Sequence, residues 1–202
     1  MTPVRLERPS AAREREFLAA ARRSRAFLWR WAAPPATGRA YRAYLDRLGR
    51  PMHVGHFVVL RSSGALVGVI NLNEIVRGSF QGAYLGYYGF LPHVGRGYMR
   101  EGLRLVLRRA FGELRLHRVE ANIQPENRAS LALVRGLGFR REGFSPRYLK
   151  VAGRWRDHQR WALLAEEWRR GGGRRSSSVV AGLPGPVRSR RGGRRSRPDR
   201  AG

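Results

Sequence analysis

A loop with two glycines is the first part of this sequence whose residue types and spacing could do chemistry. Gly95-Arg96-Gly97 lies between a predicted strand over 83–91 and a predicted helix that follows the second glycine. Glycine lets the backbone turn sharply and approach a ligand closely, and a helix N-terminus offers unpaired N–H groups and the positive end of a dipole. Arg96 and Arg100 add positive charge. The loop therefore either binds a phosphate group or carries its glycines only for the turn.

The loop also excludes two common classes of nucleotide-binding protein. It contains neither G-x-x-x-x-G-K-[ST] nor G-x-G-x-x-G, the phosphate-binding motifs of P-loop proteins and Rossmann folds. The chain has no cysteine, which excludes disulfides, thiolate zinc sites and cysteine nucleophiles together. We expect no metal site.

A second group of polar residues follows later in the chain. Glu120, Asn122 and Gln124 alternate along a predicted strand and share one face, which either lines a cleft or faces solvent. Asn127 and Ser130 occupy the Ncap and N3 positions of the next predicted helix. Capping alone can explain this pair, because asparagine is among the best Ncap residues.

Further candidates for proton transfer are more scattered. Glu74 ends a predicted strand ahead of a loop, where it is either a general base or a surface carboxylate. His117 lies in a turn before a strand and is either a base or structural. Tyr87 and Tyr88 point to opposite faces of a strand, so one belongs to the core and the other can line an acceptor channel. Tyr148 is expected near the mouth of the cleft.

Hydrophobic periodicity predicts the elements that must position these residues. Helices and strands alternate in the order β-α-α-β-β-β-α-β-α-β-β, and hairpins combined with helix-linked strands indicate an α/β or α+β fold with a mixed sheet. The predicted strands are 4–8, 56–61, 65–72, 83–91, 119–124, 148–151 and 155–164, and the predicted helices are 11–32 capped by Ser10, 38–48 capped by Thr37 and stopped by Gly49, 98–114, and 128–135.

Composition divides the 202 residues into a patterned body over 1–168 and an Arg/Gly/Ser-rich tail over 169–202. The tail has almost no large apolar groups, so we predict that it is disordered. Of the formal net charge of +27, +10 falls on the tail and +17 on the body. Such a charge is typical of proteins with a polyanionic neighbour, and the tail could make a weak, salt-dependent contact with RNA or the ribosome. A GC-rich genome that writes arginine wherever a cation is tolerated explains the charge equally well.

The N-terminal region has no signal-peptide pattern. Arginines interrupt the apolar residues of 17–31, and five glycines and a proline break the longest uncharged stretch, 78–95. We therefore expect a cytoplasmic protein without a membrane anchor.

Several separated motifs resemble one known family. The runs GRGYMREGLRLVL (95–107), HRVEANIQPENRASLALVRGLGFRREG (117–143) and YLKVAGRWRDH (148–158) are similar, in the same order, to the GCN5-related N-acetyltransferases (GNAT). They look most like the RimJ/RimL branch, which acetylates the N-termini of ribosomal proteins. VRGSF (76–80) and YLGY (84–87) are closer to the RimJ type. The resemblance covers 4–168 and identifies 1–168 as an N-acetyltransferase domain.

The resemblance implies a GNAT fold, a mixed and mostly antiparallel sheet of about seven strands that splays to admit acetyl-CoA as co-substrate. The family's phosphate-binding pattern, Gln/Arg-x-x-Gly-x-Gly/Ala, falls on Val94–Met99, where only Gly97 obeys it. Arg96 or His93 would then supply the missing charge, and backbone groups at the strand end would meet the pantetheine arm. The implied cofactor-binding residues are Phe90, Leu91, Gly95, Arg96, Gly97, Tyr98, Met99, Asn127 and Ser130.

The resemblance also defines the catalytic roles. Many family members place a tyrosine seven residues after the asparagine to protonate the departing thiolate, but that position is Val134 here, so Ser130 is the substitute candidate. Glu120 and Glu74 are the candidate bases. An α-amino group has a pKa of roughly 7.7–8.0, so roughly a tenth is uncharged at pH 7 and only a modest base or a water relay is needed.

Three functions remain open from the sequence. The first is acetyl transfer to the α-amino group of a protein N-terminal residue, with alanine of a ribosomal protein as the expected acceptor. The second is acetylation of a small amine or an antibiotic. The third is a catalytically degenerate GNAT-fold protein that associates with the ribosome or RNA, which the valines at 94 and 134 favour.

Overall fold

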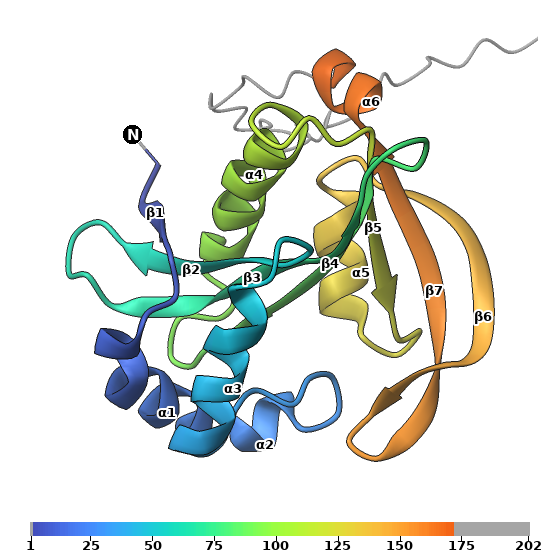
Figure 1. Ribbon diagram of the computed structural model, residues 1–202. Coiled ribbons are helices and arrows are strands. Elements are labelled where there is room, and N and C mark those ends of the chain that lie inside the picture. Colours follow the sequence, from blue (N-terminus) through green and yellow to red (C-terminus); the bar gives the residue numbers. More distant parts are fainter. Residues whose placement is uncertain (1, 172–202) are drawn as a thin grey trace, which may run out of the picture.

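A computed structural model describes residues 2–171, so almost all of the predicted tail lies outside the described residues. A seven-stranded sheet in the order β1-β2-β3-β4-β5-β7-β6 forms the centre of the fold (Figure 1). Its strands are β1 (Val4–Glu7), β2 (Val54–Leu60), β3 (Leu66–Val76), β4 (Gly82–Gly89), β5 (Arg118–Ile123), β6 (Arg140–Val151) and β7 (Arg154–Leu164). The helices are a 3-10 turn η1 (Ala11–Arg13), α1 (Glu14–Arg23), α2 (Arg25–Leu28), α3 (Gly38–Leu48), α4 (Tyr98–Phe111), α5 (Arg128–Arg135) and α6 (Ala165–Arg170).

The sheet is mixed, as predicted, with a single parallel contact among the described strands between β4 and β5. That contact is short: Gly82–Tyr84 pair with Arg118–Glu120, and no pairing continues beyond Tyr84 and Glu120. The two strands run on for several residues without each other. The predicted splay of the sheet is therefore present, and it begins at Glu120.

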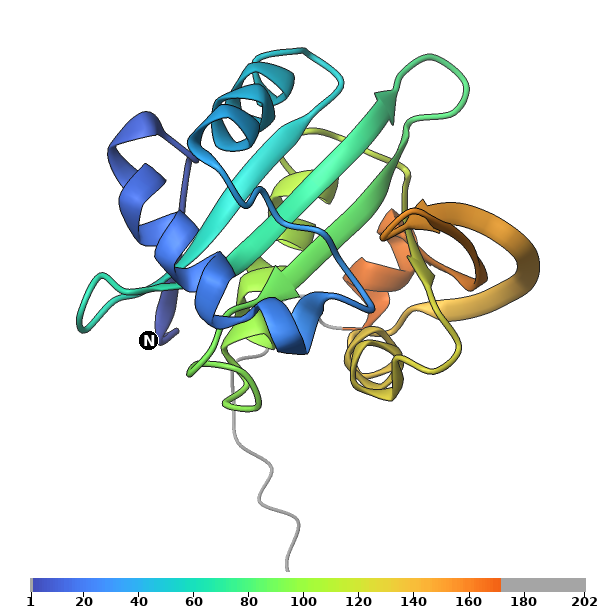
Figure 2. The ribbon, with the colours of Figure 1, turned by 90° about the horizontal axis from the view of Figure 1, so that it is seen from below.

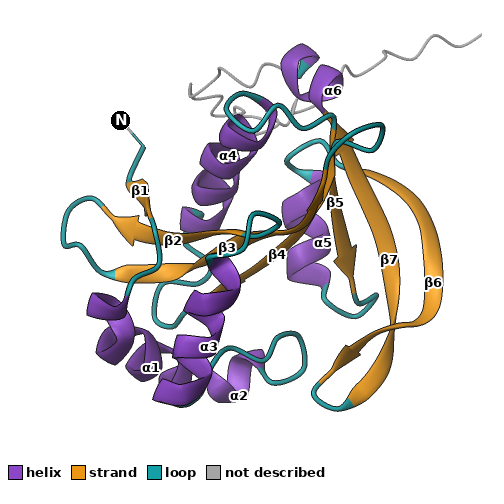
Figure 3. Ribbon diagram, viewed as in Figure 1, coloured by secondary structure: helices purple, strands orange, loops and turns teal. Residues whose placement is uncertain are grey.

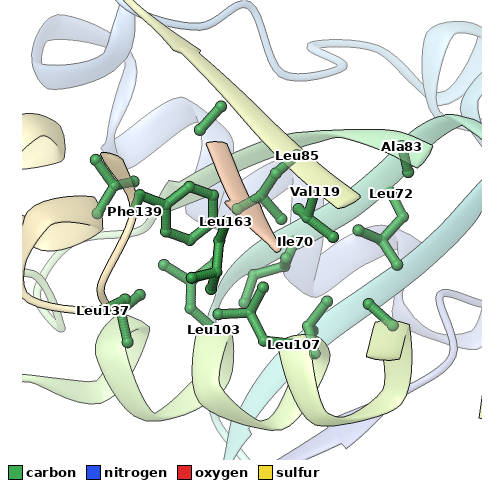
Figure 4. Close-up of a cluster of buried hydrophobic side chains, with 14 of the residues drawn as sticks. Ile70, Leu72, Ala83, Leu85, Leu103, Leu107, Val119, Leu137, Phe139 and Leu163 are labelled. Atoms are coloured by element: carbon green, nitrogen blue, oxygen red, sulfur yellow. The ribbon is translucent and has the colours of Figure 1, made fainter. Parts of the chain in front are cut away.

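Helices cover the two faces of the sheet unequally (Figures 2 and 3). On one face, α1, α2 and α3 bury Phe17, Leu28 and Tyr41 against β2 and β3. On the other face, α4 presents Leu103 and Leu107 to Ile70 of β3, as Figure 4 shows. The helical periodicity of 98–111 is thus explained, because these positions form the buried stripe of α4.

Two caps and one hairpin agree with the sequence. Thr37 accepts a hydrogen bond from the Ala40 N–H at 3.2 Å, and Asn127 accepts one from the Ser130 N–H at 3.2 Å. The turn between β2 and β3 ends at Gly64, whose φ of 71° is the left-handed conformation that glycine adopts readily. At these three sites, the local sequence was sufficient to predict the local structure.

The predicted helix over 11–32 is wrong as a single element. The structure breaks it into η1, α1 and α2, and Ser10 makes no side-chain cap. The break before α2 falls at Ser24, whose buried hydroxyl accepts a hydrogen bond from the Leu91 N–H at 2.9 Å. The break therefore coincides with a hydrogen bond between residues 67 positions apart in sequence, and helical periodicity cannot predict such a contact.

Two further elements differ from the prediction. β6 begins at Arg140 rather than near Tyr148, and α6 was not predicted. Gly49 closes α3 in a right-handed conformation, with φ −73°, rather than the left-handed one expected of a C′ glycine. Within residues 2–171, none of the helices combines the length and apolar character needed to cross a bilayer.

His56 of β2 gives the fold a dependence on pH. It is buried beneath α4, and neither ring nitrogen has a hydrogen-bond partner among the described residues. Burial, followed by the charge of Arg109, lowers the pKa of His56 to about 4. Between pH 6.5, the ordinary pKa of histidine, and about pH 4, His56 is protonated in the unfolded chain but neutral in the folded one. The free energy of unfolding therefore falls as the pH drops through this range.

We expect the free energy of unfolding to lose about 2 kcal/mol between pH 7.5 and pH 5 through His56 alone. His56→Leu keeps the site filled and apolar, so its loss over the same interval is smaller by that amount. Urea unfolding of both proteins at the two pH values measures the difference. Equal losses would show that His56 does not cause the pH dependence.

Candidate active site

The loop before α4 has the geometry of an anion site. Gly95 and Gly97 both have φ of 78°, and a Cβ on either would meet nothing within 4 Å. Gly97 is the N-cap residue and has no side chain to cap the helix, so the first-turn N–H groups lack an internal acceptor there. Open space in front of uncapped N–H groups at the positive end of a 14-residue helix suits a phosphate group.

The two departures from the family pattern in this loop have a packing explanation. Val94 and Met99 both lie against Gly89 of β4, where an added Cβ would come within 3.2 Å of each side chain. Met99 also covers Gly68 of β3, whose Cβ would lie 2.5 Å from the Met99 sulfur. These side chains therefore anchor the loop to the sheet. The groups that this loop offers to an anion are its backbone N–H groups and the nearby arginines.

Positive charge gathers beside the loop from two separate parts of the chain. Arg96 is exposed on the loop itself, and Arg23 at the end of α1 donates a hydrogen bond to the Leu91 carbonyl at 2.8 Å. Partial burial, followed by the charges of Arg96 and Arg23, lowers the pKa of His93. His93 is therefore mainly neutral at pH 7, and the two arginines supply the charge. Arg23 could not be found from the sequence, because no spacing links it to the loop.

Phe90 and Leu91 do not present free backbone groups, contrary to the expectation. The Phe90 N–H donates to the Val67 carbonyl, the Leu91 N–H to Ser24, and the Leu91 carbonyl accepts from Arg23. Because backbone groups of successive strand residues point to opposite edges, the Phe90 bond to β3 turns Tyr87 and Gly89 toward the β5 side. That is the side where pairing has ended, so Tyr87 and Gly89 are better candidates to meet an extended substrate arm.

The start of α5 faces the same gap. The Tyr87 hydroxyl donates a long hydrogen bond of 3.4 Å to the Ser130 carbonyl, which joins β4 to the first turn of α5. Asn127 caps this turn, so its capping role is real. Val134 is fully buried in the core and takes no part in the gap. The structure therefore brings Tyr87, Asn127 and Ser130 together.

Glu120 lies at the point where β4 and β5 separate. Its carboxylate is paired with the Arg118 guanidinium at 2.7 Å, and Arg118 also pairs with Glu142 of β6. The Arg118 hydrogen bond lowers the pKa of Glu142. Val119 and Ala121 belong to the core that includes α4 and α5, so Glu120, which alternates with them along β5, faces the opposite side of the sheet. It is therefore placed to meet an acceptor that approaches this face.

Asn122 and Gln124 share this face with Glu120 but differ in their surroundings. Gln124 is buried and donates a hydrogen bond to the Arg30 carbonyl at 3.0 Å, so it ties β5 to the segment after α2. The Asn122 side-chain oxygen is buried without a hydrogen-bond partner among the described residues. Only part of this row is therefore solvated.

Two other candidates lie away from the gap. Glu74 is more than half exposed at the far end of β3, and its carboxylate is 3.8 Å from His53. His117 is exposed at the closed end of the β4–β5 contact, where its N–H donates to the Gln81 carbonyl. Neither residue lies with Tyr87, Ser130 or Glu120.

The β6–β7 hairpin forms one wall of a polar cavity of about 290 Å³. Trp155, Arg156 and Asp157 line it from the hairpin, and Arg30, Trp31, Gln124 and Glu126 complete it. Asp157 accepts a hydrogen bond from the Arg147 N–H at 2.7 Å, and His158 contacts the Arg156 carbonyl. The first of these contacts joins the two strands of the hairpin, while Trp155 is exposed at the cavity.

A second cavity, of about 420 Å³, lies beneath α3 on the same face of the sheet. Tyr88 and the hydrogen-bonded pair Tyr44 and Asn71 are among its lining residues, and Ala33–Ala36 border it. Tyr87 and Tyr88 therefore do point to opposite faces of β4, with Tyr87 toward α5 and Tyr88 toward α3.

Comparison with known proteins agrees with this geometry. The sequence profile of the acetyltransferase (GNAT) domain matches residues 4–140. The probable N-acetyltransferase YjcK of Bacillus subtilis is 38% identical over 121 residues, which cover 60% of this chain and 67% of that protein. The [ribosomal protein uS5]-alanine N-acetyltransferase of Escherichia coli is 40% identical over 103 residues, which cover 51% of this chain and about half, 53%, of that protein.

Solved structures share the fold. RimJ of Mycobacterium smegmatis, in complex with CoA-disulfide, superposes with a TM-score of 0.72 at 25% identity and covers 84% of this chain and 89% of that chain. Spermidine N-acetyltransferase of Vibrio cholerae, in complex with CoA and spermine, superposes with a TM-score of 0.72 at 18% identity and covers 84% of this chain and 99% of that chain. The chain belongs to the GNAT acetyltransferase family, whose acetyl donor is acetyl-CoA.

Proposed function

We propose that this protein transfers the acetyl group of acetyl-CoA to the α-amino group of a protein N-terminal residue, with alanine of a ribosomal protein as the acceptor. The observation that carries the proposal is the end of β4–β5 pairing at Tyr84 and Glu120. The gap beyond this point has the glycine loop at one side and the start of α5 at another. A long, phosphate-bearing thioester fits such a gap.

Cofactor binding in this proposal is divided between two ends. Backbone N–H groups of Gly95–Met99, with Arg96 and Arg23 nearby, hold the pyrophosphate. Backbone groups of Tyr87 and Gly89 replace Phe90 and Leu91 in contacts with the pantetheine arm. Asn127 and Ser130 border the thioester end.

The acceptor amine approaches from the face that carries Glu120. Attack requires the neutral amine, and for an α-amino group a carboxylate or a water relay to it is sufficient. Glu120 is our candidate base because it lies where the strands separate, and its carboxylate is held there by the Arg118 guanidinium. Glu74 does not lie at this gap. Orientation of the amine against the thioester carries much of the rate.

The choice of a protein N-terminus over a small amine has support from sequence relatives. The Escherichia coli relative at 40% identity is named for a ribosomal-protein alanine, whereas the spermidine enzyme at 18% identity shares the fold alone. A small-amine acceptor is therefore the second candidate function. Val94 no longer supports the hypothesis of a catalytically degenerate protein. Its side chain packs against Gly89, and the space beside Gly95 and Gly97 stays open.

Two measurements test the proposal. Calorimetry of the purified protein with acetyl-CoA is expected to show binding, and its absence would contradict the enzyme assignment in favour of a degenerate protein. Mass spectrometry of ribosomal-protein N-termini in a deletion strain is expected to show at least one N-terminal alanine that has lost its acetyl group. Unchanged acetylation, together with turnover of spermidine by the purified protein, would favour the small-amine function.

A further inference from the structure

Tyr87 is a half-buried tyrosine whose hydroxyl group the expected family chemistry does not use. It lies three residues beyond the last β4–β5 pair, and its side chain points to the face covered by α5. Its hydroxyl reaches the carbonyl of Ser130 in the first turn of α5, at 3.4 Å. The phenol group therefore spans from β4 to α5 across the region where the strands have separated.

The surroundings of this hydroxyl keep it protonated and loosely held. Burial raises the pKa of Tyr87 to about 12. Hydroxyl hydrogen bonds to oxygen are normally 2.5–3.0 Å long, so the contact of 3.4 Å is weak and is easily exchanged for a better acceptor. A developing thiolate is such an acceptor, because hydrogen bonds to charged groups are stronger than those to neutral carbonyls.

The position on α5 that would normally supply this hydroxyl cannot do so. Val134 has no polar atom in its side chain and is fully buried. Ser130 is the alternative on the same helix, and its backbone carbonyl is the group that Tyr87 contacts. The tyrosine on β4 thus reaches the first turn of α5 from the opposite side of the gap.

We propose that Tyr87 is the catalytic acid that protonates the departing coenzyme A thiolate, in place of a residue from α5. This inference rests on the acetyl transfer proposed above. The amine nitrogen forms a bond to the acetyl carbon, the carbon–sulfur bond breaks, and its electron pair goes to sulfur. Sulfur takes the Tyr87 proton, the amine nitrogen gives its proton to Glu120 or water, and the phenolate regains a proton from solvent. The products are the N-acetylated acceptor and the free thiol.

The chain offers a closely matched control. Tyr41 of α3 is fully buried and, like Tyr87, donates its hydroxyl to a backbone carbonyl, that of Ser10 at 2.8 Å; burial raises its pKa to about 12 as well. It lies in the core beneath α1 and α3, on the other face of the sheet. Tyr41→Phe therefore removes the same atom, with the same kind of hydrogen bond, without touching the gap.

The first readout is binding, which requires no turnover. At pH 9.5 the thiol of coenzyme A, with a pKa near that of cysteine at about 8.5, is mainly ionised. We expect the wild type to bind coenzyme A roughly tenfold more tightly than desulfo-coenzyme A at pH 9.5, and with little preference at pH 7. Tyr87→Phe should lose this preference while keeping its affinity for acetyl-CoA, and Tyr41→Phe should retain it.

The second readout is turnover with acetyl-CoA and a synthetic peptide that begins with alanine. Tyr87→Phe is expected to lower kcat about 100-fold with little change in KM for acetyl-CoA, as for loss of a general acid. Ser130→Ala is expected to have a smaller effect. If Tyr87→Phe retains the thiolate preference and wild-type kcat, or if Ser130→Ala alone loses them, the assignment to Tyr87 is wrong. A wild type that does not bind acetyl-CoA would instead overturn the proposed function itself.

Discussion

Replacement of Gly97 by tryptophan is expected to weaken acetyl-CoA binding at least 100-fold and leave the protein folded. Gly97 has φ of 78°, a Cβ added there would meet nothing within 4 Å, and the residue is the N-cap of α4, so we expect a tryptophan to be accommodated and to obstruct the first turn of the helix. The left-handed conformation costs a non-glycine residue about 1–2 kcal/mol of stability. Calorimetry with acetyl-CoA, together with urea unfolding, separates the two effects.

Gly64→Trp is the matched control for this substitution. Gly64 has φ of 71° and a Cβ added there would also have nothing within 4 Å, but it lies in the β2–β3 hairpin. It should lose similar stability and bind acetyl-CoA normally. If Gly97→Trp bound acetyl-CoA as tightly as Gly64→Trp does, the phosphates would have to bind away from this loop.

Replacement of Gly68 by alanine is expected to destabilise the protein by about 2–3 kcal/mol, far more than the size of one methyl group suggests. A Cβ at Gly68 would lie 2.5 Å from the Met99 sulfur and 2.5 Å from the Tyr88 carbonyl oxygen. The methionine can turn away, but the carbonyl belongs to the neighbouring strand and cannot move alone. Because Met99 lies in the first turn of α4, relief of the clash is expected to displace the glycine loop as well, so acetyl-CoA affinity should fall too.

Gly82→Ala tests whether the cost belongs to Gly68 or to any strand glycine. Gly82 is also a buried strand residue, but its Cβ would come no closer than 3.6 Å to another atom. Alanine there should be neutral or slightly stabilising, because it reduces the entropy of the unfolded chain. Urea unfolding of both variants decides the matter. Equal stability losses would show that the close approach of Met99 and the strands at Gly68 is unimportant.

The sequence was informative wherever a local signal determined the structure. The spacing of Leu103 and Leu107 predicted α4 and its buried face, and Asn127 predicted a helix start that its side chain does cap. The family resemblance predicted the splay between β4 and β5. These features depend on residues that are neighbours along the chain or that a family shares.

Contacts between distant segments could not be predicted in the same way. The Leu91 N–H donates a hydrogen bond to Ser24, and the Leu91 carbonyl accepts one from Arg23, although these residues are 67 and 68 positions away in sequence. No pattern in either segment predicts these hydrogen bonds. The sequence therefore could not show that the backbone groups of Phe90 and Leu91 already have partners within the protein. The contact between Tyr87 and Ser130 could not be predicted either. Alternation along β4 predicts the face of the sheet on which the tyrosine lies, but not which residue of another element it contacts. An isolated glycine in a strand, as at Gly68, was the one available signal for a close approach.

The brief contact between β4 and β5 has a mechanical consequence. Among the described residues, the four-stranded and three-stranded halves of the sheet are joined by only three pairs of strand residues, Gly82–Tyr84 with Arg118–Glu120, and by the backbone hydrogen bonds to the Gln81 carbonyl beside them. This seam is much weaker than the ladders on either side of it. A ligand that lies in the gap and contacts both strands would link them where they make no hydrogen bonds to each other. Binding of the acetyl donor would therefore stiffen the whole sheet, and it would stabilise the folded state in proportion to the logarithm of donor concentration.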